Sequence, residues 1–153
     1  MSLNNLRNTI NKLEQFNWGA ELETIVTTNT DALVQLQELQ LYEGIDSKGS
    51  QITLDGRGYS KKTFEIKTAK GQPTDRVTWK DTGALYSSLE AILTSNSITF
   101  TSVSEEVKFN IMIERSGPDV IGLDEEKRLQ FATNITLPAI KQIFNDKTGF
   151  VIS

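Results

Sequence analysis

The sequence predicts an α+β fold, with helices packed on a small antiparallel β-sheet and with a long loop and extended arms. Segments toward both ends carry apolar residues at spacings of three and four, which is typical of a helix face. Two short segments in the second half alternate apolar and polar residues, which is typical of strands. The chain of 153 residues can bury a core. We therefore predict a single domain, residues 1–153, made of N-terminal helices (1–44), a basic loop with short strands (45–80), a helix–hairpin–helix core (81–145) and a C-terminal tail (146–153).

The first 44 residues are predicted to be helical. Apolar residues recur at helical spacing over residues 3–16, and a second stripe runs from about residue 20 to residue 42. Trp18-Gly19 is expected to interrupt the pattern, although the two segments could form one bent helix. Gly44 is well suited to end this region, because glycine adopts the left-handed conformation that closes many helices.

The residue pattern changes over residues 45–80, where no helix is predicted. Residues 45–50 have the composition of a turn. The segment 57–76 carries six Lys and Arg against two acidic residues, a local net charge of +4. Residues 63–67 alternate and could form a short strand. We expect a long, partly mobile loop with a functional role, and we expect that deleting residues 57–76 would leave the fold intact.

A helix over residues 82–93 is predicted to follow. Asp81 or Thr82 can cap its first turn, and Leu85, Leu89 and Ile92 fall on one face. Such a short amphipathic helix needs a surface to pack on. We expect that surface to be a β-hairpin, formed by strands 97–103 and 107–113.

Asp124 is a second predicted helix cap, followed by two glutamates in the first turn, where the helix dipole favours negative charge. Pro138 lies inside the apolar pattern of this helix and should kink it, or split it after Leu137. Residues 148–152 could form a last strand, or an apolar tail that docks on a neighbour.

The composition excludes several kinds of chemistry. The chain has no histidine and no cysteine, so it lacks the usual general base near neutral pH, the thiolate nucleophile and the zinc–thiolate site. The glycine pair of Gly56-Arg57-Gly58 lacks the context of a phosphate-binding motif. In Asp46-Ser47-Lys48-Gly49, which superficially resembles a calcium loop, a lysine stands at a ligand position. We predict no catalytic residue, cofactor or metal.

The net charge of −4 argues against a general nucleic-acid binder, and no apolar run approaches the ~20 residues of a membrane span. The start of the sequence does not have the form of a signal peptide. We therefore expect the cytoplasm, or a particle assembled there, and no membrane partner. A small-molecule substrate is not expected either.

Three short patterns stand in order along the chain. The first has the form G-x-D-[SA]-x-G and contains Gly44, Asp46 and Gly49. The second has the form D-T-G-x-L-x-x-S-[IL] and contains Asp81, Thr82, Gly83, Leu85 and Ser88. The third, before a long helix, is similar to G-L-[ST]-x-[ED] and contains Gly122 and Leu123. A segment rich in lysine, with Tyr59, lies between the first two.

Together these patterns resemble the virion-morphogenesis proteins of bacteriophages, the tail-completion and head–tail joining group, across roughly residues 20–145. The chain departs from that group before its last helix, where residues 114–120 lack the usual histidine and Arg-Pro-Phe run. The resemblance implies a non-enzymatic virion protein of the neck or tail, assembled in the host cytoplasm. It also implies rings of about six or twelve copies that contact the portal or adaptor and other neck or tail proteins.

On this interpretation the 55–80 loop and the terminal arms reach to neighbouring subunits. The expected contact residues are those of the basic loop: Arg57, Tyr59, Lys61, Lys62, Lys67, Lys70 and Arg76. The alternative is a small nucleic-acid-binding or regulatory protein that acts through the 57–76 segment, whose aromatic and basic residues could stack on single strands. The loop of a ring subunit could equally face DNA in the channel. A third interpretation assigns the segment no partner: it is then a solvated loop whose aromatic residues are turned to the core.

Overall fold

The computed structural model describes residues 3–95 and 97–149. The described residues divide into two compact units. The first contains the chain up to Asn29 together with the chain from Gln130 onward, and the second contains Thr30–Leu129. The predicted α+β class is confirmed: helices predominate and an antiparallel pair of strands accompanies them. The helix–hairpin–helix order predicted for residues 81–145 is wrong in its bounds: only residues 84–87 are helical before the hairpin, the hairpin spans residues 89–102, and residues 106–116 are helical.

The first unit is helical. It comprises α1 (Leu3–Glu14), α2 (Trp18–Thr28), a π-helical turn (Ala132–Thr136) and α8 (Leu137–Thr148), with α1 against α8 and α2 against the π turn. The two N-terminal helices were predicted, but Trp18 and Gly19 open α2 instead of breaking the pattern. The break comes just before them, because the Asn17 side chain accepts a hydrogen bond from the Ala20 amide at 3.1 Å and caps α2.

The helices are interrupted at two places, of which only the second was predicted. The single helix predicted over about residues 20–42 is broken at Asn29, whose side-chain amide donates to the Ile25 carbonyl at 2.7 Å, and α3 (Thr30–Glu43) begins after it. Pro138 lies in the first turn of α8, and the π turn directly precedes it. Proline has no N–H to donate and its ring crowds the carbonyl four residues earlier, which lies in the π turn. The helix is not split after Leu137, because α8 begins at Leu137 and continues through Pro138.

The second unit is organised around α3. Strand β1 (Leu89–Thr94) lies along this helix and pairs antiparallel with β2 (Ser97–Ser102), in a register that runs from Leu89 opposite Ser102 to Thr94 opposite Ser97. Helix α6 (Glu106–Ser116) packs against β2 and leads into a 3₁₀ turn (Pro118–Val120) and α7 (Glu125–Phe131). The core of this unit is apolar: Leu41, Ile52, Val77, Leu85, Tyr86, Leu89, Phe109, Met112 and Val120.

The helix predicted for residues 82–93 is wrong beyond its first turn. Only α5 (Ala84–Ser87) is helical, and the chain then enters β1. The hydroxyl of Ser88 donates to the Leu85 carbonyl at 2.7 Å, and its oxygen lies 2.7 Å from the hydroxyl oxygen of Ser102 on β2. The next residues alternate between buried or half-buried and exposed positions, as in a strand.

The predicted hairpin has the wrong partner. Residues 97–102 do form a strand, but they pair with β1, and residues 107–113 belong to α6. A strand would place Val107 and Phe109 on one face, yet Val107 is exposed and Phe109 is buried together with Met112, three residues later. The spacing of three and four residues from Phe109 to Met112 and Ile113 is therefore the signal that distinguishes helix from strand here, and it indicates a helix.

The basic loop also contains regular structure. Residues 63–67, predicted as a possible strand, lie in α4 (Lys61–Ala69), and the hydroxyl of Ser60 caps this helix by accepting from the Thr63 amide at 3.2 Å. At the C-terminal end, Thr148 lies in α8 and Gly149 caps it with φ +74°. The remainder of the predicted tail falls outside the described residues. None of the described helices is long and apolar enough to cross a bilayer.

Candidate functional site

Two buried glutamines on α3 bind the segment that precedes α7. Gln37 accepts a hydrogen bond from the Gly122 amide at 2.8 Å. Gln40 donates to the Gly122 carbonyl at 2.8 Å and accepts from the Asp124 amide at 2.7 Å. Both side chains are completely buried. The backbone of residues 122–124 belongs to no strand, and its polar groups find their hydrogen-bond partners in these two side chains of α3.

The turn that follows α3 lies against the same segment. Gly44 ends the helix with φ +74°, as predicted. The carboxylate of Asp46 accepts from the amides of Lys48 and Ser50 at 2.9 and 2.8 Å. The amide of Ser47 donates to the Asp119 carbonyl at 2.8 Å. A Cβ at Gly122 would lie 3.3 Å from the Cβ of Ser47, so the first and third sequence patterns, more than 70 residues apart in the sequence, are in contact.

The second pattern contributes to the core of the same unit. Leu85 and Tyr86 are buried in it, and the Tyr86 hydroxyl donates to the Thr78 carbonyl. Burial raises the pKa of this hydroxyl far above its usual range. Gly83 has φ +94°, and Thr82 accepts from the Ala84 amide at 3.3 Å. Asp81 is exposed, and a hydrogen bond from Lys70 lowers the pKa of its carboxyl group.

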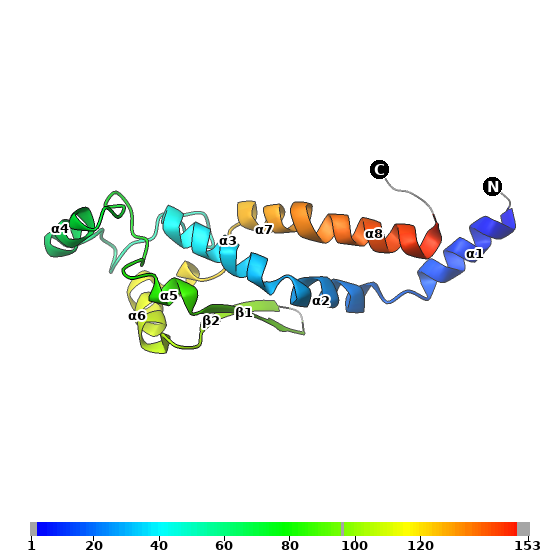
Figure 1. Ribbon diagram of the computed structural model, residues 1–153, viewed down its shortest axis with the longest axis horizontal. Helices are drawn as coiled ribbons and strands as arrows, with labels where there is room; N and C mark the ends of the chain where they lie inside the picture. The colour runs from blue at the N-terminus through cyan, green and yellow to red at the C-terminus, as the bar shows by residue number, and fades with distance from the viewer. Residues whose placement is uncertain (1–2, 96, 150–153) are drawn as a thin grey trace. The chain divides into compact units, whose positions relative to one another are not determined.

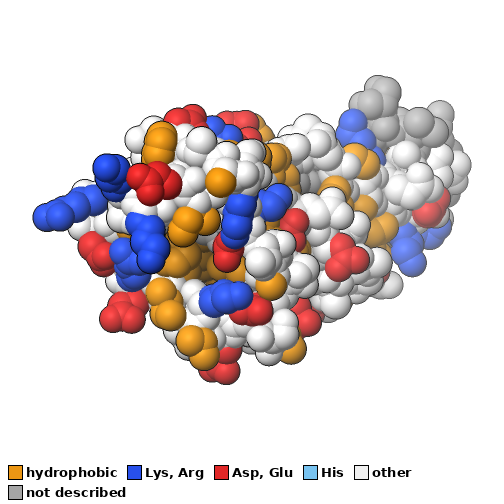
Figure 2. All heavy atoms as spheres, turned by 60° about the vertical axis from the view of Figure 1, so that its left-hand side comes forward, with side chains coloured by type: hydrophobic (Ala, Val, Ile, Leu, Met, Phe, Trp, Pro, Cys, Tyr) orange, Lys and Arg blue, Asp and Glu red, His pale blue; other side chains and the backbone are white. Residues whose placement is uncertain are grey.

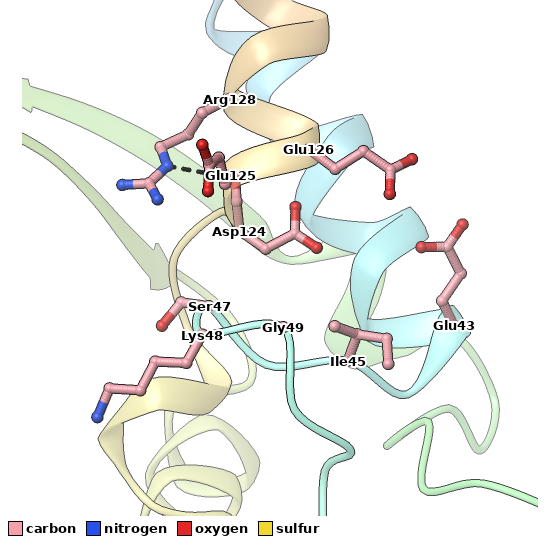
Figure 3. A pocket seen from close by; sticks show the side chains of 9 residues that line it. All are labelled: Glu43, Ile45, Ser47, Lys48, Gly49, Asp124, Glu125, Glu126 and Arg128. Atoms are coloured by element: carbon pink, nitrogen blue, oxygen red, sulfur yellow. Dashed lines mark hydrogen bonds between the residues drawn. The ribbon is translucent and has the colours of Figure 1, made fainter.

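An open hollow of about 640 Å³ lies between the 45–49 turn and the start of α7 (Figure 3). Asp124 caps α7 by accepting from the Lys127 amide at 2.8 Å, as predicted. The buried ammonium group of Lys127 lies 2.8 Å from the Glu43 carboxylate and 3.7 Å from that of Glu126. Lys48 points away from the hollow, toward its ion pair with Asp119. Three of the four carboxylates of the hollow are thus already engaged by groups of the chain itself, and within residues 3–95 and 97–149 no acidic cluster suits a metal ion.

The predicted contact residues of the basic segment separate into two groups. The inner group holds the chain together. Lys67 is buried, and its ammonium group donates to the Lys80 carbonyl at 2.6 Å and contacts Gln72 and Thr78 at 3.2 and 3.4 Å. It also lies 4.9 Å from the centre of the Tyr59 ring, whose hydroxyl accepts from the Thr78 amide at 2.8 Å.

Arg76 and Lys70 are also used internally. Arg76 donates to the Tyr42 carbonyl at 2.8 Å and pairs with Asp75, and Lys70 pairs with Asp81. The expectation of a dispensable, mobile loop is therefore at odds with the structure, because this segment supplies anchors for α3 and for the residues before α5. Sequence alone did not show this, since a buried lysine without a carboxylate partner has no local signature.

The outer group comprises Arg57, Lys61 and Lys62, which are exposed and form no ion pair with any described residue. Two exposed apolar side chains, Phe64 and Ile66, share α4 with the lysines. Figure 2 shows Lys and Arg side chains projecting among hydrophobic ones on the face that it brings forward. We use the name α4 face for Lys61, Lys62, Phe64 and Ile66 of this helix together with Arg57, which precedes it.

A second surface, which the sequence analysis missed, runs between α3 and β1. This hollow of about 570 Å³ is lined by Asp31, Glu38 and Glu90 together with Val34, Gln35, Leu89 and other residues. Within the described part of the chain, none of the three carboxylates has an ion pair. Burial raises the pKa of Glu38, and the nearby Lys80 offsets part of that effect. The seven-residue spacing from Asp31 to Glu38, two turns of one helix, was the available signal. We call this surface the acidic groove.

Comparison of the chain with protein-family models, with curated proteins and with solved structures found no match.

Proposed function

We propose that the chain is a non-enzymatic structural protein of a bacteriophage or prophage virion, which forms an oligomeric ring at the head–tail junction. One observation carries the proposal: the three sequence patterns that resemble the tail-completion group contribute to one compact unit. Gly44 and Asp46 lie in the turn against Gly122, and Leu85 lies in the core beneath α3. The first and third patterns are in contact, and the second supplies Leu85 to the core of the same unit.

The chemistry of the candidate site supports the same role. Histidine and cysteine are absent from the sequence, and the polar groups of the hollow beside α7 serve as a cap and as ion pairs. Such an arrangement stabilises a shape and offers no activated nucleophile. A ring subunit needs surfaces that complement its neighbours, not a reacting centre.

Helix α1 supports an assembly role through its exposed apolar face. Leu3, Leu6 and Ile10 recur at helical spacing, and their exposed fractions are 84, 43 and 46%. No described residue of this helix is buried. An apolar stripe of this kind is typical of a contact surface for another molecule. We therefore propose that this N-terminal arm packs on a neighbouring subunit or on an adjoining neck or tail protein.

The test is the size of the particle. Light scattering and analytical ultracentrifugation over a wide range of protein concentration, alone and with the portal protein of the same phage, should reveal a closed species of defined copy number. Negative-stain electron microscopy should show rings. A chain that stays monomeric at every concentration, with and without the portal, overturns the proposal.

A second candidate is binding to nucleic acid, and the α4 face favours it. Lys61 and Lys62, exposed and without ion partners, share α4 with Phe64, which could stack on a base, and the exposed Arg57 precedes this helix. Because Lys67 and Arg76 are engaged inside the chain, about three phosphate contacts are available. The logarithm of the affinity for single-stranded DNA should then fall with the logarithm of the salt concentration with a slope of about −2. Binding that does not respond to salt rules this candidate out.

A further inference from the structure

The α4 face combines exposed apolar surface with a net positive charge, which the exposed Glu65, located between Lys61 and Lys62 around the helix, reduces by one. Lys61 stands three residues before Phe64, and Lys62 stands four residues before Ile66, so each lysine neighbours an apolar side chain on the helix surface. The exposed fractions of Phe64 and Ile66 are 49 and 45%. On the other side of the helix, the hydrogen bonds of Lys67 hold α4 to residues 72–80. The face is therefore presented by an anchored helix.

The acidic groove has the opposite charge and a similar mixture of surface. Asp31, Glu38 and Glu90 give it three negative charges, and its lining includes no Lys or Arg. Val34, Leu89 and Ala91 supply apolar surface between the carboxylates. Lys80 lies near enough to act on the charge of Glu38, but none of the three carboxylates forms an ion pair with a described residue.

Both surfaces belong to the second unit, but they lie apart on it. Figure 1 shows α4 at one end of this unit, away from β1 and the part of α3 that borders it. Because Lys67 anchors α4, this helix cannot reach the groove of its own chain. Two complementary surfaces at different places on one subunit define a heterologous interface, which generates a ring when the rotation closes.

We propose that copies of this chain associate head to tail, with the α4 face of one copy seated in the acidic groove of the next. The inference rests on the proposed ring and names the surfaces that build it. Lys61 and Lys62 meet the carboxylates of the groove, while Phe64, one turn after Lys61, covers its apolar lining. The charge of each surface excludes pairing with its own kind, so that copies join in one direction.

Reciprocal charge reversal tests the pairing. One variant reverses the α4 face (Lys61→Glu with Lys62→Glu), and the other reverses the groove (Asp31→Lys with Glu90→Lys). Each alone opposes like charges, and its assembly constant should weaken on the order of 100-fold or more. An equimolar mixture should form rings again, since the reversed helix of one variant meets the reversed groove of the other. Combining all four substitutions in one chain should also restore rings.

The matched control carries Lys48→Glu and Lys108→Glu. Both lysines are exposed, lie in the same unit and form surface ion pairs of small energetic value. This control makes the same charge change as the α4 variant and should assemble like the wild type. Melting curves of all variants show whether each is folded.

A cross-link gives a second, independent measurement. Because the chain contains no cysteine, Lys62→Cys combined with Gln35→Cys in the groove introduces a unique pair. Oxidation should yield a ladder of covalent oligomers on a denaturing gel, and each single-cysteine variant should yield dimers at most. High salt should reduce the ladder, because screening weakens the attraction between the surfaces.

The outcomes separate this inference from the proposed function. If the wild type forms rings and either reversed variant does too, or if the mixture stays monomeric, the pairing is wrong while the ring stands. If reversal of α4 abolishes binding to single-stranded DNA and leaves assembly unchanged, the α4 face serves nucleic acid and the pairing is again wrong. A wild type that never assembles overturns both proposals.

Discussion

The side chain of Gln40 forms two hydrogen bonds with a segment more than 80 residues further along the chain. Its amide nitrogen donates to the Gly122 carbonyl at 2.8 Å, and its carbonyl oxygen accepts from the Asp124 amide at 2.7 Å. Gln37, one turn earlier, accepts from the Gly122 amide. The amide nitrogen of Gln37 has no hydrogen-bond partner among the described residues. The two glutamines therefore make unequal contributions to the same contact.

This inequality gives the first prediction. Gln40→Leu leaves a buried donor and a buried acceptor unpaired and should lower the free energy of unfolding by about 2–5 kcal/mol. Gln37→Leu leaves one donor unpaired but also removes its own unpaired nitrogen, so its cost should be about 1–2 kcal/mol. Gln35→Leu, on the exposed side of α3, is the control. Denaturant titration measures all three, and equal costs for the two buried glutamines would contradict the assignment.

Gly44 and Gly49 form a matched pair for a second prediction. Both have positive φ, +74° and +77°. A Cβ at Gly44 would lie 2.9 Å from the Cβ of Arg76, whereas a Cβ at Gly49 meets nothing within 4 Å. Gly49→Ala should therefore cost only the backbone strain of about 1 kcal/mol, and Gly44→Ala about 2–4 kcal/mol. Thermal unfolding of the two variants checks the difference, which should vanish if Arg76 packs elsewhere.

Lys67 is predicted to hold α4 in place. Lys67→Met keeps the aliphatic stem but removes the ammonium group, leaving the Lys80 carbonyl without its donor. We expect a loss of about 1–3 kcal/mol and amide exchange in residues 61–69 that is faster by 10-fold or more. Lys61→Met, at an exposed position of the same helix, should leave exchange unchanged. For the same reason, deletion of residues 57–76 should impair folding. If protection from amide exchange is unaltered in the Lys67 variant, Lys67 does not hold this segment in place.

Glu38 gives a prediction for pH. Burial raises the pKa of its carboxyl group above the ordinary 4.5. The stabilising contribution of this group is therefore complete below the pKa of the unfolded chain and is lost as the pH rises through the pKa of the folded chain. Glu38→Gln should be slightly more stable than the wild type at pH 7, by less than about 1 kcal/mol after allowance for solvent screening. That advantage should disappear below pH 4.5. A difference that does not change with pH would show that charge is not its cause.

Several elements could be read from local patterns. The helices near both ends, the cap at Asp124, the left-handed end of α3 at Gly44 and the irregularity at Pro138 each depend on residues a few positions apart. The α+β class followed from the same patterns. For these features the interactions that decide the structure are local, and so is the signal.

Other elements could not be predicted from local patterns. Val107, Phe109, Ile111 and Ile113 fit a strand, and Phe109, Met112 and Ile113 fit a helix. Packing of Phe109 and Met112 in the core selected the helix, and that choice left β2 to pair with β1. Likewise, the acidic groove joins residues of α3 and β1 that are more than 50 positions apart in the sequence.

The sequence by itself determined the class of the fold, the end of α3 at Gly44, the cap of α7 at Asp124 and the absence of histidine and cysteine chemistry. Only the tertiary structure decided which strand pairs with which, that Lys67 is buried while Lys61 and Lys62 are exposed, and that Gln37 and Gln40 bind residues 122–124. The physical reason is that burial and hydrogen bonding of these groups depend on surfaces brought together from distant segments. Such surfaces exist only once the chain has folded.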